Sequence, residues 1–331
     1  MIAVIAFSQK GMALGEKLTA YLQSAGEESR LSRGGKEGCS LAEWAAEAFS
    51  SADALVFVGA AGIAVRAIAP HVRAKTIDPA VVAIDELGRF VIPLLSGHIG
   101  GANALAARLA SALGAQAVIT TATDLNGVFA VDSWAVEKGL AIGHCENIKA
   151  VSSALLQGKT AWIESDFPLQ GALAPGLKAG RGAPQICVSY REQPGLLLIP
   201  PVLALGIGCR RGVSADALEE QIARWLKEAG FRIEAVCEVH TIDLKAEEAG
   251  LLEFCKRRGW RLFCHSAEEL KRAEGAFTPS AFVKSVTGVE NVCERAAALA
   301  GRLVLKKQSG NGMTLAASEK PFLLQTEGEK Q

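Results

Sequence analysis

The amino-acid sequence predicts an α/β fold, with two parallel-sheet α/β domains joined by a smaller, variable middle region. Apolar runs of strand length alternate with segments of helical periodicity in the first part of the chain. The alternation weakens between residues 137 and 200 and restarts after Pro200 and Pro201. Buried apolar strands that alternate with helices are typical of a parallel sheet. We therefore expect an N-terminal domain at 1–136, a middle domain or connector at 137–200 and a C-terminal domain at 201–331.

The first domain is predicted from its leucine spacing and its turn residues. Leu14, Leu18 and Leu22 recur every four residues, which favours a helix with one buried face. Asp85-Glu-Leu-Gly88 predicts a hairpin turn, and Gly114 is typical of a residue that ends a helix. We expect strands at 2–7, 54–58, 81–84, 90–93 and 116–120, helices at 11–23, 41–49 and 103–113, and a short helix that ends at Pro70.

The later elements are predicted from capping residues. Ser214 and Gly230 suit the start and end of a helix with a regular apolar face. The sequence Thr287-Gly-Val-Glu290 has the form of a capping box, which predicts a helix from about residue 288 to 300. Asn311-Gly312 favours a hairpin. We expect strands at 160–163, 202–207, 233–236, 303–305 and 313–316, and helices at 151–157, 214–228 and 288–300.

Composition excludes several classes of protein. Lysine plus arginine equals aspartate plus glutamate at 35 each among 331 residues, so no overall field attracts nucleic acid. The most apolar stretch, 195–209, is split by Pro200 and Pro201, so we expect no membrane span. The first residues lack the basic region of an export signal, which favours a cytoplasmic protein. Eight scattered cysteines without a CxxC pair favour reduced thiols and no metal site.

The first candidate site lies between a predicted strand and a predicted helix. It comprises Gly206, Gly208, Cys209, Arg210, Arg211 and Gly212. Glycines let backbone N–H groups approach an anion near a helix start, and arginine binds carboxylates in a forked geometry. The segment lacks the Walker pattern and the third glycine of a dinucleotide loop. It predicts anion binding, and the alternative is a tight turn with two solvated arginines.

The second candidate is a glycine-rich loop around a histidine, before the helix at 103–113. It comprises Ser96, Gly97, His98, Gly100, Gly101 and Asn103. Histidine is the side chain best suited to proton transfer near neutral pH. We expect His98 at a catalytic site, and the alternative is a histidine that only satisfies its own turn.

Two further loops also follow predicted strands. Gly59 and Gly62 precede Arg66, and we expect them to line a crevice beside the His98 loop at the carboxyl edge of the sheet. Their alternative role is packing. The segment 120–127 carries Thr121 and Asp124, and Asp124 can orient a histidine or a water. An Asx turn is the equally weighted alternative there.

The loops give the chain a family resemblance. Segments 58–70, 93–110 and 119–132 resemble the N-terminal part of the CbiG family, and 204–222, 285–300 and 312–316 resemble its CobE-like C-terminal domain. The resemblance implies a cobalt-precorrin-5A hydrolase of anaerobic cobalamin biosynthesis. Such an enzyme opens the ring A δ-lactone of a cobalt-corrinoid with water and releases acetaldehyde, giving cobalt-precorrin-5B.

The residues fit the chemistry that the resemblance implies. A water, a general base and oxyanion donors are needed for lactone opening. We expect His98 as the base, Asp124 as the next candidate, and the amides of Gly97, Gly100 or Gly101 as donors. The rim carboxylates of the macrocycle require arginines and backbone N–H groups. We predict these substrate-binding residues: Gly59, Gly62, Arg66, Ser96, Gly97, Gly100, Gly101, Asn103, Thr121, Gly206, Gly208, Cys209, Arg210, Arg211, Gly212 and Thr287.

The resemblance also implies what the protein works with. The substrate is a small-molecule cobalt-corrinoid that brings its own cobalt, so no protein-bound cofactor or metal is expected. We expect no nucleic-acid or membrane partner, and a homodimer and transient contact with other cobalamin-pathway enzymes stay open. Two alternative functions remain at this stage, a non-catalytic corrinoid or tetrapyrrole carrier and a nucleotide-using α/β enzyme. A carrier needs the anion sites but no positioned base, and release of acetaldehyde distinguishes the hydrolase from both alternatives.

Overall fold

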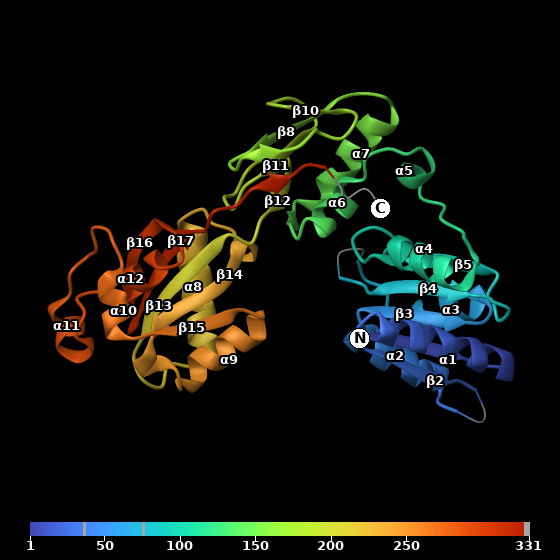
Figure 1. The fold of residues 1–331 in the computed structure, drawn as a ribbon, viewed down its shortest axis with the longest axis horizontal. Helices are drawn as coiled ribbons and strands as arrows, with labels where there is room; N and C mark the ends of the chain where they lie inside the picture. The colour runs from blue at the N-terminus through green and yellow to red at the C-terminus, as the bar shows by residue number, and fades with distance from the viewer. Residues whose placement is uncertain (36–37, 75–76, 328–331) are drawn as a thin grey trace. The chain divides into compact units, whose positions relative to one another are not determined.

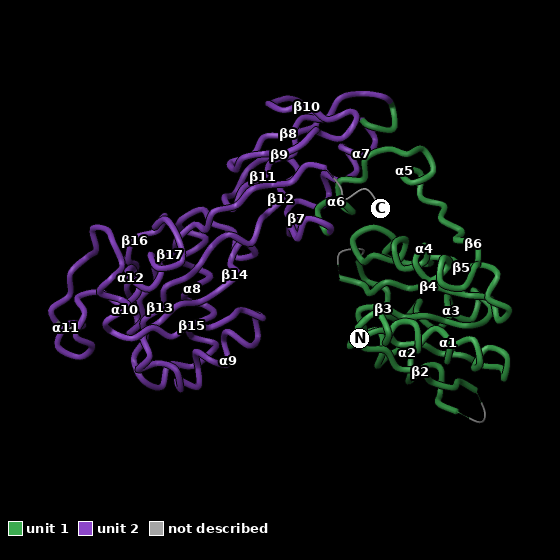
Figure 2. Tube along the Cα trace, in the orientation of Figure 1, with its two compact units in different colours: residues 1–136, 155–157 green, residues 137–154, 158–331 purple. Residues whose placement is uncertain are grey.

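The computed structural model describes residues 1–35, 38–74 and 77–327 (Figure 1). The last four residues of the predicted 201–331 domain therefore lie outside the described residues. The chain forms two compact units, which Figure 2 shows in different colours. Unit 1 comprises residues 1–136 and 155–157, and unit 2 comprises 137–154 and 158–331. The expected α/β fold class is confirmed, because each unit contains mainly parallel β-structure together with helices.

Unit 1 is built on one six-stranded sheet. Its strand order is β2 (Ser29–Arg33), β1 (Ile2–Ala6), β3 (Ala54–Val58), β4 (Ala80–Ile84), β5 (Phe90–Leu95) and β6 (Gln116–Ala117). Strands β1 to β4 are parallel, β5 runs antiparallel to β4, and β6 runs parallel to β5. The predicted hairpin at 85–88 is confirmed, but the strand predicted at 116–120 pairs only over its first two residues.

Helices cover both faces of this sheet. One core contains residues of α1 (Gln9–Ser24) and α4 (Ala102–Leu113), and another contains residues of α2 (Leu41–Ser51) and α3 (Ala61–Ile68). The expected apolar face of α1 is confirmed, because Leu18 and Leu22 are fully buried in the first core. Gly114 ends α4 in the left-handed conformation, as predicted.

The direction of β5 decides where the candidate loops lie. Leu95 at the end of β5 pairs with Val81 near the start of β4, whereas Val58 at the end of β3 pairs with Ile84. The loop after β5 therefore lies at the amino edge of the parallel strands, and the loop after β3 lies at their carboxyl edge. The two short helices α5 (Ala122–Leu125) and α6 (Val131–Glu137) follow β6 along the chain.

Unit 2 contains two larger sheets. The first has the order β10 (Leu177–Ala179), β8 (Ala161–Ser165), β11 (Gln185–Val188), β12 (Leu196–Ile199) and β7 (Ala141–Gly143). The helix α7 (Ile148–Leu156) confirms the helix predicted at 151–157, and β8 confirms the strand predicted at 160–163. A small sheet pairs β9 (Leu169–Gln170) with β18 (Leu324–Gln325), so a strand near the end of the described chain lies beside the middle region.

The second large sheet of unit 2 has the order β15 (Arg261–His265), β14 (Val236–Ile242), β13 (Leu203–Cys209), β17 (Met313–Glu319) and β16 (Arg302–Gly310). The predicted helix at 214–228 is confirmed as α8 (Ala215–Glu228), and the Ser214 hydroxyl caps it by accepting a hydrogen bond from the Ala217 N–H. The hairpin at Asn311 and Gly312 is also confirmed, since both have positive φ between β16 and β17.

Two predicted elements of this sheet layer are wrong in their limits. The helix expected at 288–300 is replaced by α11 (Ala281–Thr287) and α12 (Cys293–Ala298). Thr287 ends α11 rather than capping the next helix, and Glu290 pairs with Lys284 at 2.8 Å. Residues 233–235 form a 3-10 turn, and the strand follows as β14. The remaining helices are α9 (Ala249–Arg258) and α10 (Ala267–Arg272).

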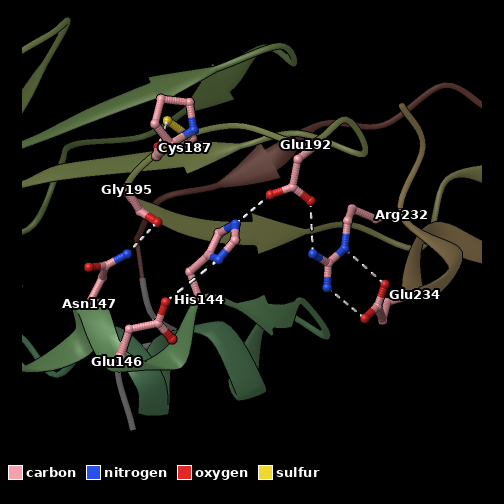
Figure 3. A network of polar contacts seen from close by, with 9 residues as sticks. His144, Glu146, Asn147, Cys187, Glu192, Gly195, Arg232 and Glu234 are labelled. Carbon is pink, nitrogen blue, oxygen red and sulfur yellow. Dashed lines mark hydrogen bonds and ion pairs between the residues drawn. The ribbon is translucent and has the colours of Figure 1, made fainter. Parts of the chain in front are cut away.

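A network of charges joins the middle sheet of unit 2 to its C-terminal part (Figure 3). The Glu192 carboxylate contacts the His144 ring nitrogen Nε2 at 2.5 Å and accepts a hydrogen bond from Arg232 at 2.9 Å. Arg232 also donates to Glu234 at 2.9 Å. Backbone hydrogen bonds from Glu192 to Gly230 and from Arg232 to Tyr190 accompany these contacts. The two parts of unit 2 are therefore held together by charged and backbone contacts.

Candidate active site

The His98 loop connects β5 to α4 in a tight conformation. The Ser96 hydroxyl donates a hydrogen bond to the backbone oxygen of Asp78 at 2.9 Å, and Ser96 has a φ of 56°. A Cβ at Gly100 would overlap Ser96, so only glycine fits there without movement. The Gly101 N–H donates to the backbone oxygen of His98 at 2.9 Å, so this predicted oxyanion donor is already used within the loop.

Two carboxylates hold the imidazole ring of His98. Its Nδ1 lies 3.2 Å from Asp132 Oδ2, and its Nε2 lies 2.9 Å from Asp124 Oδ2. The Thr123 hydroxyl lies 3.3 Å from the same Nε2. An ionised carboxylate only accepts hydrogen bonds. Both ring nitrogens therefore carry protons when both carboxylates are ionised, and the ring is an imidazolium cation.

Electrostatics favour the same protonation state. The hydrogen bond with Asp132 is the largest of the causes that raise the pKa of His98 to about 9. Partial burial lowers this pKa, and the hydrogen bond with Asp124 raises it further. Burial is the largest single influence on the pKa of Asp132 and raises it, but the hydrogen bond and the charge of His98, together with backbone hydrogen bonds, lower this pKa overall. The exposed fraction is 7% for the Asp132 side chain and 37% for that of Asp124. Asp124 is therefore the carboxylate that water and substrate can reach.

Asn103 fixes the exposed carboxylate from the first turn of α4. Its Nδ2 donates to Asp124 Oδ2 at 3.0 Å and to the Thr121 hydroxyl at 2.9 Å. A Cβ at Gly97 would lie 2.8 Å from the Asn103 amide oxygen, so Gly97 allows the amide to lie close to the loop. Asp124 Oδ2 is thus hydrogen-bonded by both His98 and Asn103, and no contact of its Oδ1 appears among the described residues.

The structure thus brings together the predicted residues of two loops and adds one that sequence reasoning missed. His98, Asn103, Thr121 and Asp124 meet because β5 and β6 run in the same direction and end at the same edge. The missed residue is Asp132, a lone acidic residue in the apolar segment 128–136, and that isolation is the signal that would have identified it.

The expectation that the Gly59 loop lines a crevice beside the His98 loop is wrong. Gly59 and Gly62 follow β3 at the carboxyl edge, and Arg66 lies on α3. The His98 loop lies at the amino edge, because β5 is antiparallel to β4. A five-residue strand separates the two edges by about 13 Å.

In unit 2 the predicted anion loop is partly occupied by the chain itself. Gly206 and Gly208 lie within β13, and a Cβ at Gly206 would overlap the backbone oxygen of Cys293 on α12. The Gly212 N–H donates to the Glu248 carboxylate at 2.7 Å. The structure therefore gives Gly206 a packing role. Glu248, which sequence reasoning missed, lies next to Gly212.

The other predicted residues of unit 2 differ in exposure. Arg210 and Arg211 are both exposed, and the Arg210 N–H donates to the Gly312 oxygen at 2.8 Å. Burial raises the pKa of the Cys209 thiol, so it is not a thiolate at neutral pH. The Thr287 hydroxyl donates to the Val283 backbone oxygen at 2.7 Å. Among the residues predicted on this unit, Arg210 and Arg211 are thus the exposed cations that an anion can reach.

The described residues contain neither a cluster of metal ligands nor a helix that could span a membrane. Within residues 1–35, 38–74 and 77–327, no group of three or more histidine, cysteine or acidic side chains is arranged to hold a metal ion. No helix in the same ranges is long and apolar enough to cross a membrane.

Comparison with known proteins gives consistent matches at both ends of the chain. The family model "Cobalamin synthesis G N-terminal" matches residues 43–124, and "Cobalamin synthesis G C-terminus" matches 203–318. A cobalt-precorrin-5A hydrolase of Salmonella typhimurium is 35% identical, with 95% of this chain and 96% of the relative covered. One of Priestia megaterium is 34% identical, with 83% and 80% covered. A solved cobalamin biosynthesis protein G homologue from Sulfolobus solfataricus is 24% identical, covers 96% of each chain and has a TM-score of 0.43.

Proposed function

This chain belongs to the CbiG family of cobalt-precorrin-5A hydrolases, and on that premise we propose that its His98 cluster is where cobalt-precorrin-5A is hydrolysed. The cluster comprises His98, Asn103, Asp124 and Asp132. One observation supports the proposal most strongly. A half-exposed carboxylate, that of Asp124, is held in place by two N–H donors, beside a glycine-rich loop that is itself only partly buried.

Asp124 acts as the general base in this proposal. Its Oδ2 is hydrogen-bonded to His98 and Asn103, which leaves Oδ1 to accept a proton from water. The water then attacks the carbonyl carbon of the substrate δ-lactone, and a positioned base of this kind typically contributes 10²- to 10⁴-fold, as an order of magnitude. The acyl C–O bond breaks, which gives a carboxylate and a hydroxyl on the two-carbon fragment. The C–C bond that joins this fragment to the macrocycle then breaks, its electron pair stays with the macrocycle, the hydroxyl loses its proton, and the fragment leaves as acetaldehyde.

His98 is a positioning residue rather than the base. As an imidazolium it has no lone pair for a proton from water, because both ring nitrogens donate to carboxylates. It orients Asp124, and buried Asp132 fixes the ring from the other side. The earlier expectation of His98 as the base therefore gives way to Asp124.

The substrate brings carboxylates and cobalt to the enzyme. We expect the exposed Arg210 and Arg211 of unit 2 to bind rim carboxylates, since a guanidinium forms charge-assisted forked bonds with them. In unit 1 we expect Gly97 and Gly100 to supply backbone N–H donors. The cobalt enters with the corrinoid, and no protein-bound cofactor is part of this proposal.

The test compares variants of the cluster with matched controls. Asp124→Asn should lower the rate of acetaldehyde release at least about a hundredfold, as loss of a general base does, while corrinoid binding persists. His98→Gln should lower the rate and change its pH profile, because the base is no longer held. The controls are Asp53→Asn and His71→Gln, which change the same residue types outside the cluster and should retain normal turnover.

Three outcomes separate the possibilities. Normal turnover of Asp124→Asn would rule out this carboxylate as the base. Tight corrinoid binding by the wild-type protein without acetaldehyde release would favour the carrier instead. A His98→Gln enzyme whose rate falls, but whose pH profile matches the wild type, would leave His98 with a purely structural role.

A further inference from the structure

A cavity lies at the opposite edge of the unit 1 sheet from His98. It has a volume of about 520 Å³, and its lining includes Phe7, Leu41, Ile63 and Arg66. Phe7 directly follows β1, and Ile63 and Arg66 lie on α3 after β3. The cavity therefore opens at the carboxyl edge, where no residue of the His98 cluster is found.

The topology of the sheet independently marks this position. The strand order β2-β1-β3-β4 means that the chain moves to one side of β1 and then to the other. In open parallel sheets this reversal creates a crevice outside the carboxyl ends of the two strands, and ligands bind there preferentially. The reversal in unit 1 falls between β1 and β3, and the cavity is lined from the segments that follow those two strands.

The floor of the cavity is an aromatic ring held between two glycines. A Cβ at Gly34 would lie 2.7 Å from a Phe7 ring carbon, and a Cβ at Gly59 would lie 3.1 Å from another. Both neighbours therefore have to be small for the ring to take this position. This explains Gly59 by packing around Phe7, which was the alternative role predicted for it.

Arg66 places a cation beside these apolar side chains. Arg66 is exposed, and no ion pair of its guanidinium appears within the described ranges. Its NH1 lies 3.7 Å from the point where a Cβ at Gly62 would be, so the side chain folds back along α3 over a residue with no side chain. The guanidinium thus lies at the start of α3, beside the apolar lining of the cavity.

We propose that this crevice is a second ligand site, for a small molecule with a flat apolar ring system and a carboxylate. The ring would pack against Phe7, Leu41 and Ile63, and the carboxylate would pair with Arg66. A volume of about 520 Å³ is ordinary for a small-molecule site. A single guanidinium beside a mainly apolar lining suits a monoanion such as a carboxylate.

The test uses 2-naphthoate as the probe and 2-naphthamide as its uncharged counterpart, followed by NMR of the full-length protein. We expect a dissociation constant on the order of 1 mM or tighter for the naphthoate, with shifts at the Ile63 methyl groups and the Phe7 ring. Arg66→Gln should weaken naphthoate binding about tenfold or more, as loss of a charge-assisted bond does, and leave naphthamide binding unchanged.

Two further variants keep the inference falsifiable. Ile63→Trp fills the cavity and should abolish binding of both probes, and its fold is checked by circular dichroism. Lys17→Gln removes an exposed cation from α1 outside the cavity and should bind naphthoate as the wild type does. The proposal is overturned if naphthoate leaves the Ile63 and Phe7 signals unmoved, or if Arg66→Gln and Lys17→Gln bind it equally well.

Discussion

The charge on His98 can be tested through its titration. The ring is 14% exposed and is hydrogen-bonded to Asp132 and Asp124, and its pKa is raised from 6.5 to about 9. A difference of that size corresponds to about 3 kcal/mol of preferential stabilisation of the charged ring. We expect Asp132→Asn to lower the pKa of His98 substantially, because the hydrogen bond with Asp132 is the largest cause of the rise.

The sign of the stability effect follows from the direction of this pKa. A group whose pKa is raised on folding stabilises the folded state fully below the unfolded pKa of about 6.5. That contribution is lost as the pH rises through the folded pKa of about 9. Unit 1 of the wild-type protein should therefore lose up to about 3 kcal/mol between pH 6.5 and pH 9 from this group. Asp132→Asn should lose much less over the same interval.

The assay combines NMR titration with denaturant unfolding. The imidazole signal of His98 is assigned by its absence in His98→Gln, which distinguishes it from the other four histidines. Unfolding of unit 1 is then followed at pH 6.5, 7.5 and 9 through the NMR indole signal of Trp44, which is buried against Phe57. A wild-type His98 that titrates near pH 6.5, or one whose titration is unmoved by Asp132→Asn, would refute the reasoning and restore His98 as a candidate base.

The remaining predictions concern binding, domain structure and packing. Replacing Arg210 and Arg211 together with alanine should weaken binding of a stable cobalt-corrinoid by roughly 1.5–3 kcal/mol, the loss of one charge-assisted bond, with little change in the denaturation midpoint; unchanged affinity in a titration contradicts it. The fragment 203–331 should fold alone, since about 130 residues is an ordinary domain size; an unfolded circular dichroism spectrum shows that the boundary is wrong. Gly206→Ala should destabilise unit 2 by about 1–3 kcal/mol through overlap with the Cys293 oxygen, and an unaltered denaturant midpoint argues against this close packing.

The sequence by itself determined the local elements that have a local cause. The caps at Ser214 and Gly114 and the turn at Asn311 involve residues within a few positions of one another, so their patterns predict them directly. The capping-box pattern at Thr287 predicted the wrong element, because Thr287 and Gly288 instead end the helix α11. Ser280 caps the start of that helix.

Only the tertiary structure decided the composition of the site. The hairpin predicted at 85–88 already implied that the next strand runs back, but which loops then share an edge depends on how β4, β5 and β6 pair. The pKa of His98 depends on Asp132, which is 34 residues away in the sequence. The physical reason is that hydrogen bonding and desolvation act through space, so residue type predicts what a side chain can do and its distant neighbours determine its charge.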